Sequence, residues 1–122
     1  MKTSKYFAES EFQRCNPPCS IEDMEQSFLD WLDEVREEAG IPFVLNCAYR
    51  SSAHDKSKGR SGNSAHCYGL AADIRCNAST TRYKIIAAAL KLGASRIGVG
   101  HTFVHLDTSH IHTQNVIWDY TE

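Results

Sequence analysis

The sequence lacks a long apolar run and a strong charge of either sign. No segment approaches the roughly 18 consecutive apolar residues of a membrane-spanning helix, so we expect no membrane insertion. The net charge is −2 and the lysines and arginines are scattered, which argues against binding to nucleic acid. Residues 1–5 are polar and do not open a secretory signal. We therefore expect a protein made in the cytosol without a signal peptide.

The sequence also lacks the even set of cysteines typical of a disulfide-stabilised domain. It has five, and an odd number without a signal argues against a disulfide framework. Cys15 and Cys19 have a spacing that a zinc knuckle or a local disulfide could use, but no second close pair follows. We interpret the cysteines as buried or idle thiols, and we expect Cys67 to point away from the neighbouring His66.

The 122 residues, 42% of them hydrophobic, fit a single domain over 1–122, which we expect to be a monomer. Apolar residues at three- and four-residue spacing predict a helix that Ser20 caps and Gly40 ends. A helical turn is expected at 52–58, with His54 and Asp55 on its solvated face or, as the alternative, at the rim of a cleft beside Arg50. A further helix is expected at 79–92, and strands at 43–49, 70–76, 96–99, 102–107 and 116–120. This order predicts an α+β fold, a small and mostly antiparallel sheet with helices packed on one side.

His66 and Asp73 stand seven residues apart, with Gly69 between them. The chain can turn at the glycine and bring imidazole and carboxylate to one point, which suggests a metal. His105, on a later predicted strand, supplies a third ligand, and three His and Asp/Glu ligands are typical of catalytic zinc. We therefore predict a zinc site of His66, Asp73 and His105 in a cleft on the sheet.

Asp107 follows His105 by two residues on the same predicted strand. Because side chains alternate along a strand, the two residues share a face. Asp107 could therefore orient a ligand histidine, hold water, or act as general base.

The same residues carry a resemblance to a known family. Residues 64–73 match the S-x-H-x-x-G-x-A-x-D motif of the zinc D-alanyl-D-alanine peptidases, a family that includes VanY-like carboxypeptidases and phage endolysins. Residues 48–51 resemble its Y-R-S segment, and residues 95–107 resemble its R-I-G and F-V-H-x-D close. Trp118 fits a tryptophan near the family's C-terminal end. The resemblance spans about residues 5–120.

The resemblance implies roles for individual residues. It makes His66, Asp73 and His105 the zinc ligands, Arg50 the cation that steadies the substrate's developing charge, and Ser64 a substrate hydrogen-bonding group. Many relatives have a glutamate as general base three residues before the last ligand, where this sequence has Thr102. Others have a histidine two residues before that ligand, where this sequence has Phe103. Asp107 is then the leading candidate for the base and His101 the second.

The resemblance thus implies a zinc metallopeptidase acting on peptidoglycan stem peptides, as a D,D-carboxypeptidase or an endopeptidase. A catalytic domain without a signal would suit a phage endolysin that reaches the cell wall after phage-mediated release. An alternative is a catalytically inactive zinc-binding module that uses the same cleft to bind a ligand. A structural zinc knuckle at Cys15 and Cys19 is a third hypothesis.

Overall fold

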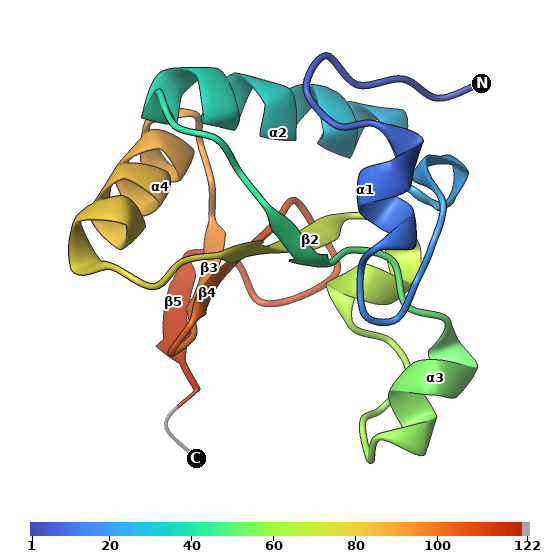
Figure 1. Cartoon of the computed structure of the whole chain (residues 1–122). Helices are drawn as coiled ribbons and strands as arrows, with labels where there is room; N and C mark the ends of the chain where they lie inside the picture. The colour runs from blue at the N-terminus through green and yellow to red at the C-terminus, as the bar shows by residue number, and fades with distance from the viewer. Residues whose placement is uncertain (121–122) are drawn as a thin grey trace.

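The computed structural model describes residues 1–120, which form a five-stranded sheet with two long helices on one face (Figure 1). This is the α+β fold predicted from the sequence. The α-helices in this part of the chain are α1 (Glu9–Gln13), α2 (Gln26–Ala39), α3 (Ser52–Ser57) and α4 (Ser79–Lys91). Two short 3-10 helices are η1 (Ile21–Asp23) and η2 (Ala65–Tyr68). None of the helices in residues 1–120 is long and apolar enough to cross a membrane.

The helix expected to run from Ser20 to Gly40 is broken near its start, which corrects the prediction. The Ser20 hydroxyl accepts a hydrogen bond from the backbone N–H of Glu22, but the cap serves only η1. The chain is extended at Met24, and the N–H of Glu25 donates to the carbonyl of Gly69 at 3.0 Å. This tertiary contact takes the place of a helical turn, and α2 begins at Gln26. The expected end is confirmed, because Gly40 adopts the left-handed conformation, φ 71°.

The strands are β1 (Leu45–Cys47), β2 (Ala71–Arg75), β3 (Arg96–Val99), β4 (Phe103–Asp107) and β5 (Val116–Asp119). Their order in the sheet is β1-β2-β4-β3-β5. Neighbours are antiparallel except β3 and β5, which run parallel. β2 and β4 lie at the centre and pair through five residues each.

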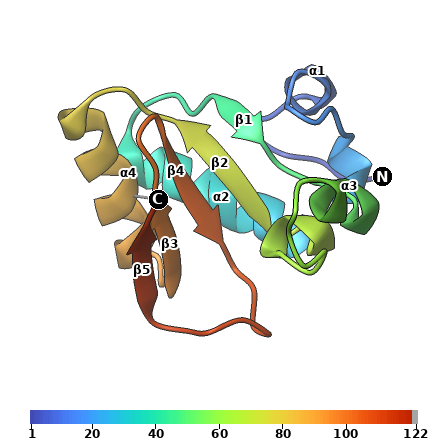
Figure 2. The same ribbon diagram turned by 90° about the horizontal axis from the view of Figure 1, so that it is seen from below.

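The core lies between the sheet and the helices. Ile74 of β2, Val104 of β4 and Phe28 of α2 are fully buried there. Alternate residues of the same strands face the other way, and Figure 2 shows that face with α2 and α4 behind the strands. The indole N–H of Trp31 donates to the carbonyl of Leu92, joining α2 to the end of α4. The helices α2 and α4 therefore cover only the core face of the sheet. The strand residues that alternate with the core residues, several of them polar, lie on the opposite, open face.

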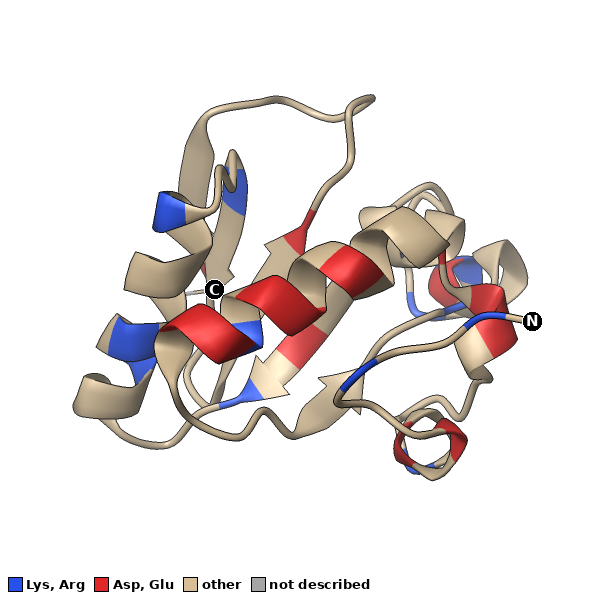
Figure 3. Cartoon of the chain, turned by 90° about the horizontal axis from the view of Figure 1, so that it is seen from above, with Lys and Arg blue, Asp and Glu red and all other residues tan. Residues whose placement is uncertain are grey.

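The outer side of α2 is acidic, as Figure 3 shows. Its exposed carboxylates are Asp30, Glu34, Glu37 and Glu38. They lie on the far side of the sheet from the open face. These four carboxylates therefore lie away from the site described next.

Candidate metal centre

A row of paired residues crosses the open face of the sheet. Cys47 of β1 is the register partner of Asp73 in β2, and Asp73 is the partner of His105 in β4. His105 pairs in turn with Gly98 of β3, and Gly98 with Trp118 of β5. Because directly paired residues project to the same face, this register alone brings a thiol, a carboxylate and an imidazole side by side.

His66 reaches the row from η2, which comes just before the start of β2. Its backbone carbonyl accepts a hydrogen bond from Arg50, which ties η2 to the segment that follows β1. Gly69 ends η2 in the left-handed conformation, φ 71°, and a Cβ there would lie 2.4 Å from the carbonyl oxygen of Asp23. The glycine of the motif therefore serves two needs, the turn and the close passage of the η1–α2 connection.

The partners of His66 define which nitrogen is free. Nδ1 lies 2.5 Å from the carbonyl oxygen of Ala48, an atom that can only accept, so Nδ1 carries a proton. Nε2 lies 3.3 Å from Oδ1 of Asp73. The nitrogen available to a metal is thus Nε2, which faces the carboxylate.

His105 lies between two carboxylates. Its Nε2 donates to Oδ2 of Asp107 at 2.7 Å, and its Nδ1 lies 3.0 Å from Oδ1 of Asp73. One oxygen of Asp73 is therefore approached by Nε2 of His66 and Nδ1 of His105. This confirms that His105 and Asp107 share a face, and it brings the three predicted ligands together.

Both oxygens of Asp107 are fully occupied. Nε of Arg96 donates to Oδ1 and Oδ2 at 2.9 and 3.0 Å, and the N–H of Ser109 donates to Oδ1 at 3.1 Å. The side chain has no exposed surface. These contacts suit a group that holds the His105 ring in place, an arrangement common at metal-binding histidines.

Burial opposes the charged form of every group in this cluster, and hydrogen bonds together with opposite charges outweigh it. Burial by itself would raise the pKa of Asp73, but hydrogen bonds with His105 and His66 outweigh it and hold the pKa well below its usual range. Burial would lower the pKa of His105, yet its contacts with Asp107 and Asp73 raise it. The pKa of His66 is also raised, by Asp73 against the effect of burial. In the metal-free chain the imidazoles thus keep a proton that a cation could replace.

The donor set fits zinc. Zinc ligands at about 2.0–2.3 Å in a tetrahedral arrangement lie roughly 3.3–3.8 Å apart. The two nitrogen-to-oxygen separations at Asp73, 3.3 and 3.0 Å, are close to that range. Both non-coordinating ring nitrogens have fixed acceptors, the Ala48 carbonyl and the Asp107 carboxylate. His66, Asp73 and His105 could therefore hold the ion with their outer partners already in place.

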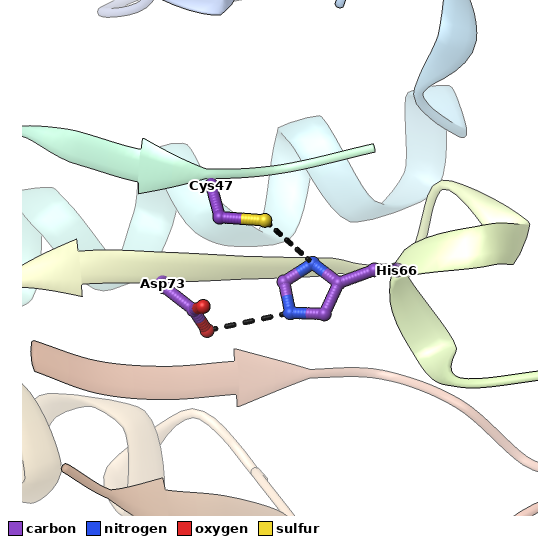
Figure 4. Close-up of side chains that lie close together, drawn as sticks. All are labelled: Cys47, His66 and Asp73. Carbon is purple, nitrogen blue, oxygen red and sulfur yellow. Dashed lines mark hydrogen bonds and ion pairs between the residues drawn. The ribbon is translucent and has the colours of Figure 1, made fainter. Parts of the chain in front are cut away.

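Cys47 is a member of the cluster that sequence reasoning missed (Figure 4). Ligand atoms of Cys47, His66 and Asp73 lie within 4.8 Å of one another. The chain of contacts from Sγ through the ring to Asp73 resembles a Cys–His–Asp triad. However, the proton on Nδ1 is directed to Ala48, so this nitrogen cannot accept one from the thiol 3.8 Å away. Cysteine-nucleophile chemistry does not fit these contacts.

Arg50 and Ser64 lie at one wall of the site. The Nη2 of Arg50 donates to the Ser64 hydroxyl at 3.3 Å, and its Nε donates to Oδ1 of Asp55 at 3.0 Å. Asp55 is fully buried, so its expected place on a solvated helix face is wrong. Helical spacing alone could not reveal this, because the carboxylate pairs with Arg50 and Arg60, which lie outside α3.

The opposite wall is aromatic. A cleft of about 310 Å³ joins the two walls and is lined by Arg50, Arg60, Ser64, His66, Asp73, Arg96, Phe103, His105, Trp118 and Tyr120. The rings of Trp118 and His105 lie 5.3 Å apart, and the Arg96 guanidinium is 5.0 Å from the Trp118 ring. A Cβ on Gly98 would lie 2.8 Å from Trp118 and from the Tyr120 hydroxyl. The glycine therefore admits the aromatic wall.

Other candidate residues lie outside this cleft. His101 is exposed in the turn between β3 and β4 and is not among the residues that line it. The sulfur of Cys67 is 3.6 Å from the Ser64 hydroxyl. Cys15 and Cys19 are free thiols beside α1, and their sulfurs donate to backbone carbonyls.

Comparison with known proteins places the chain in a family. No curated protein matches it. A family model described as Peptidase M15 matches residues 5–107, which include His66, Asp73, His105 and Asp107. The chain belongs to the peptidase M15 family.

Proposed function

We propose that the protein is a zinc-dependent peptidase that hydrolyses peptide bonds in peptidoglycan stem peptides, as a D,D-carboxypeptidase or an endopeptidase. The observation that carries the proposal is the approach of Nε2 of His66 and Nδ1 of His105 to one oxygen of Asp73. Membership of a peptidase family supports the reaction class. Action on the cell wall, after release of the kind phage endolysins use, is part of the proposal and rests on the sequence resemblance.

The chemistry divides between the ion and the cleft. Zinc held by His66, Asp73 and His105 supplies Lewis-acid polarisation of a peptide carbonyl and activation of water. Arg50 is restrained by Asp55 and lines the cleft, where it can donate hydrogen bonds to a substrate carbonyl or carboxylate as charge develops. Ser64 lies within reach of the same guanidinium and can orient the substrate backbone.

Asp107 is proposed as a positioning residue and not as the general base. A base needs a free oxygen within reach of the proton it removes. Asp107 accepts from Arg96, His105 and Ser109 and has no exposed surface. The other candidate, His101, is not among the residues that line the cleft. Of the roles expected for Asp107, holding the ligand histidine is the one its contacts favour.

Digestion of purified peptidoglycan tests the function. Zinc-loaded protein should release muropeptide fragments, a chelator should stop the release, and added zinc should restore it. His66→Ala should be inactive, whereas His110→Ala, which changes an exposed histidine, should behave as the parent. Mass analysis of products from a defined muropeptide identifies the bond. Intact walls after treatment with folded, zinc-loaded parent would exclude the proposal.

A zinc-binding module without turnover is the second candidate. Two observations favour it: Thr102 stands where relatives have a glutamate, and both Asp107 oxygens are occupied. This candidate predicts that zinc-loaded parent binds a muropeptide in calorimetry without cleaving it. Cleavage that depends on Arg50, lost in Arg50→Ala while zinc is retained, would rule it out.

A further inference from the structure

The segment between α1 and η1 brings together two cysteines that the proposed function does not use. Cys15 is 3% exposed, and Cys19 is half-buried against the core. The backbone N–H groups of both residues donate to a single atom, the carbonyl oxygen of Phe12, at 3.2 and 3.1 Å. This approach of the two backbones suits a disulfide, which needs Cα atoms about 4.4–6.8 Å apart.

The two thiols themselves are in contact. The sulfur of Cys15 donates to the carbonyl of Glu11 at 3.4 Å, and the sulfur of Cys19 donates to the carbonyl of Phe12, the next residue, at 3.7 Å. The two side chains are also hydrogen-bond partners of each other. Both are free thiols, so the pair is a dithiol whose sulfur atoms already lie together.

The segment is held against β1 without a covalent link. The N–H of Asn16 donates to the carbonyl of Asn46 at 2.9 Å, and the Cys15 sulfur lies 4.0 Å from the carbonyl oxygen of Leu45. A disulfide between Cys15 and Cys19 would therefore form on a backbone that is already in place. Such order avoids the distortion of native geometry that weakens many engineered disulfides.

We propose that Cys15 and Cys19 are a site of reversible oxidation and form a disulfide by exchange with a small-molecule disulfide. The inference goes beyond the proposed function and does not rest on it. The sulfur of Cys19 attacks the small disulfide, whose S–S bond breaks; a mixed disulfide forms, and one thiol leaves with the proton of Cys19. The sulfur of Cys15 then attacks that of Cys19, and a second thiol leaves with the proton of Cys15. The two cysteines lose two electrons, and the small disulfide gains them.

The two cysteines differ in the way that this reaction requires. A hydrogen bond from the Cys15 thiol lowers the pKa of Cys19 against the effect of burial, and the backbone N–H of Tyr49 acts in the same direction. The hydrogen bond with Cys19, together with burial, raises the pKa of Cys15. Because the thiolate is the nucleophile, the more accessible sulfur attacks first and the buried one resolves the mixed disulfide.

Oxidation of the full chain by 2-hydroxyethyl disulfide, at rising ratios to 2-mercaptoethanol, tests the inference. An uncharged reagent is suitable because the carboxylates of Asp23 and Glu9 act on the Cys19 sulfur. After acid quenching and unfolding, free thiols are alkylated and the chain is digested with trypsin. Peptide 15–36 contains both cysteines and no other. In the oxidised chain it should lose two hydrogen atoms and take up no alkyl group, and excess 2-mercaptoethanol should reverse both changes.

Single substitutions separate the roles of the two sulfurs. Cys15→Ser should trap the mixed disulfide on Cys19, because the resolving sulfur is absent. Cys19→Ser should leave Cys15 reduced in the folded chain, because the remaining thiol is buried. Cys67→Ser removes the other half-buried cysteine and is the matched control. It should form the bond within peptide 15–36 at the same reagent ratio as the parent.

Three results in the parent chain would overturn the inference, and none depends on the folding of a variant. The first is peptide 15–36 alkylated at both cysteines even without 2-mercaptoethanol. The second is a mixed disulfide on Cys19 that persists without closing. The third is a bond from either cysteine to Cys67. Failure of the chain to digest peptidoglycan would count against the proposed function and would leave this inference standing.

Discussion

Two aspartates beside the cleft have side chains without exposed surface, and both are paired with arginine, Asp107 with one and Asp55 with Arg50 and, at 3.9 Å, Arg60. Asp107 contacts Arg96 from the neighbouring strand, and Asp55 contacts Arg50 five residues earlier. Neither carboxylate lies free in the cleft. Their contribution at the level of single residues is to fix the orientation of His105 and Arg50.

The substitution Asp107→Asn distinguishes two roles for Asp107, positioning of His105 and general-base catalysis. An amide in place of the carboxylate weakens the contact that fixes the His105 ring, so zinc affinity should fall about 10–100-fold. Competition with a chromophoric chelator measures this. Asp30→Asn, on the exposed side of α2, is the matched control and should leave affinity unchanged. Lost turnover with zinc affinity intact would instead identify Asp107 as the base.

Asp55→Ala should destabilise the fold. Removing one partner of a buried ion pair leaves the other uncompensated, at a typical cost of about 3 kcal/mol in the free energy of unfolding. Urea denaturation of the metal-free chain checks this against Asp30→Ala. A change within about 0.5 kcal/mol, the usual range for surface substitutions, would show that the Asp55–Arg50 pair is structurally dispensable.

At the level of elements, β3 connects the centre of the sheet to the aromatic wall. Gly98 sits between His105 on β4 and Trp118 on β5. Because Gly98 has no side chain, Trp118 and Tyr120 lie over β3, and the Trp118 ring comes within 5.3 Å of the His105 ring. One small residue thus sets the width of the cleft on this side.

Gly98→Ala should push the aromatic wall outward. Its Cβ would lie 2.8 Å from Trp118, and overpacking of this kind costs about 1–3 kcal/mol. Trp118→Leu in the same chain should recover part of that cost, because it removes the ring that the methyl group meets. Thermal unfolding of the four members of this double-mutant cycle measures the coupling. Additive effects of the two substitutions would show that the close approach carries no energy.

The parts of the fold and of the site that were predicted correctly from the sequence depend on residues close together along the chain. The alternation in 103–107 and the His66–Gly69–Asp73 spacing are local, and the structure brings these residues together where they were expected. The predicted start of α2 was wrong. The capping signal at Ser20 is local, but the helix is interrupted by the hydrogen bond from Glu25 to the Gly69 carbonyl, and Gly69 lies 49 positions after Ser20 in the sequence. The place of Cys47 was missed for the same reason: it depends on the β1–β2 register, which no local spacing encodes.

Across the whole molecule, the carboxylates and the imidazoles of the site respond to pH in opposite directions. The pKa values of Asp73 and Asp107 lie below the ordinary 3.8, so the stability they contribute is present above that pH and lost as pH falls through their folded values. The pKa values of His66 and His105 lie above the ordinary 6.5. Their contribution is present below pH 6.5 and lost as pH rises through their folded values.

The metal-free chain should therefore be most stable between about pH 4 and 6.5 and weaken towards alkaline pH. Zinc should reverse that decline, since it replaces the imidazole protons and binds more tightly as they become scarce. Thermal unfolding measured from acid to alkaline pH gives stability as a function of pH, with chelator for the metal-free chain and with zinc for the loaded chain. Equal zinc stabilisation at pH 5 and pH 8 would contradict this coupling.

The arrangement of layers has a consequence for substrate size. α2 and α4 lie behind the sheet, and the cleft opens on the other face between the Arg50 and Ser64 wall and the Trp118 and Tyr120 wall. A substrate meets these walls without crossing the helical layer. Under the proposed function, the site would select the short stretch of peptide that fits between the two walls, and the rest of a large polymer attached to that peptide would remain in solvent.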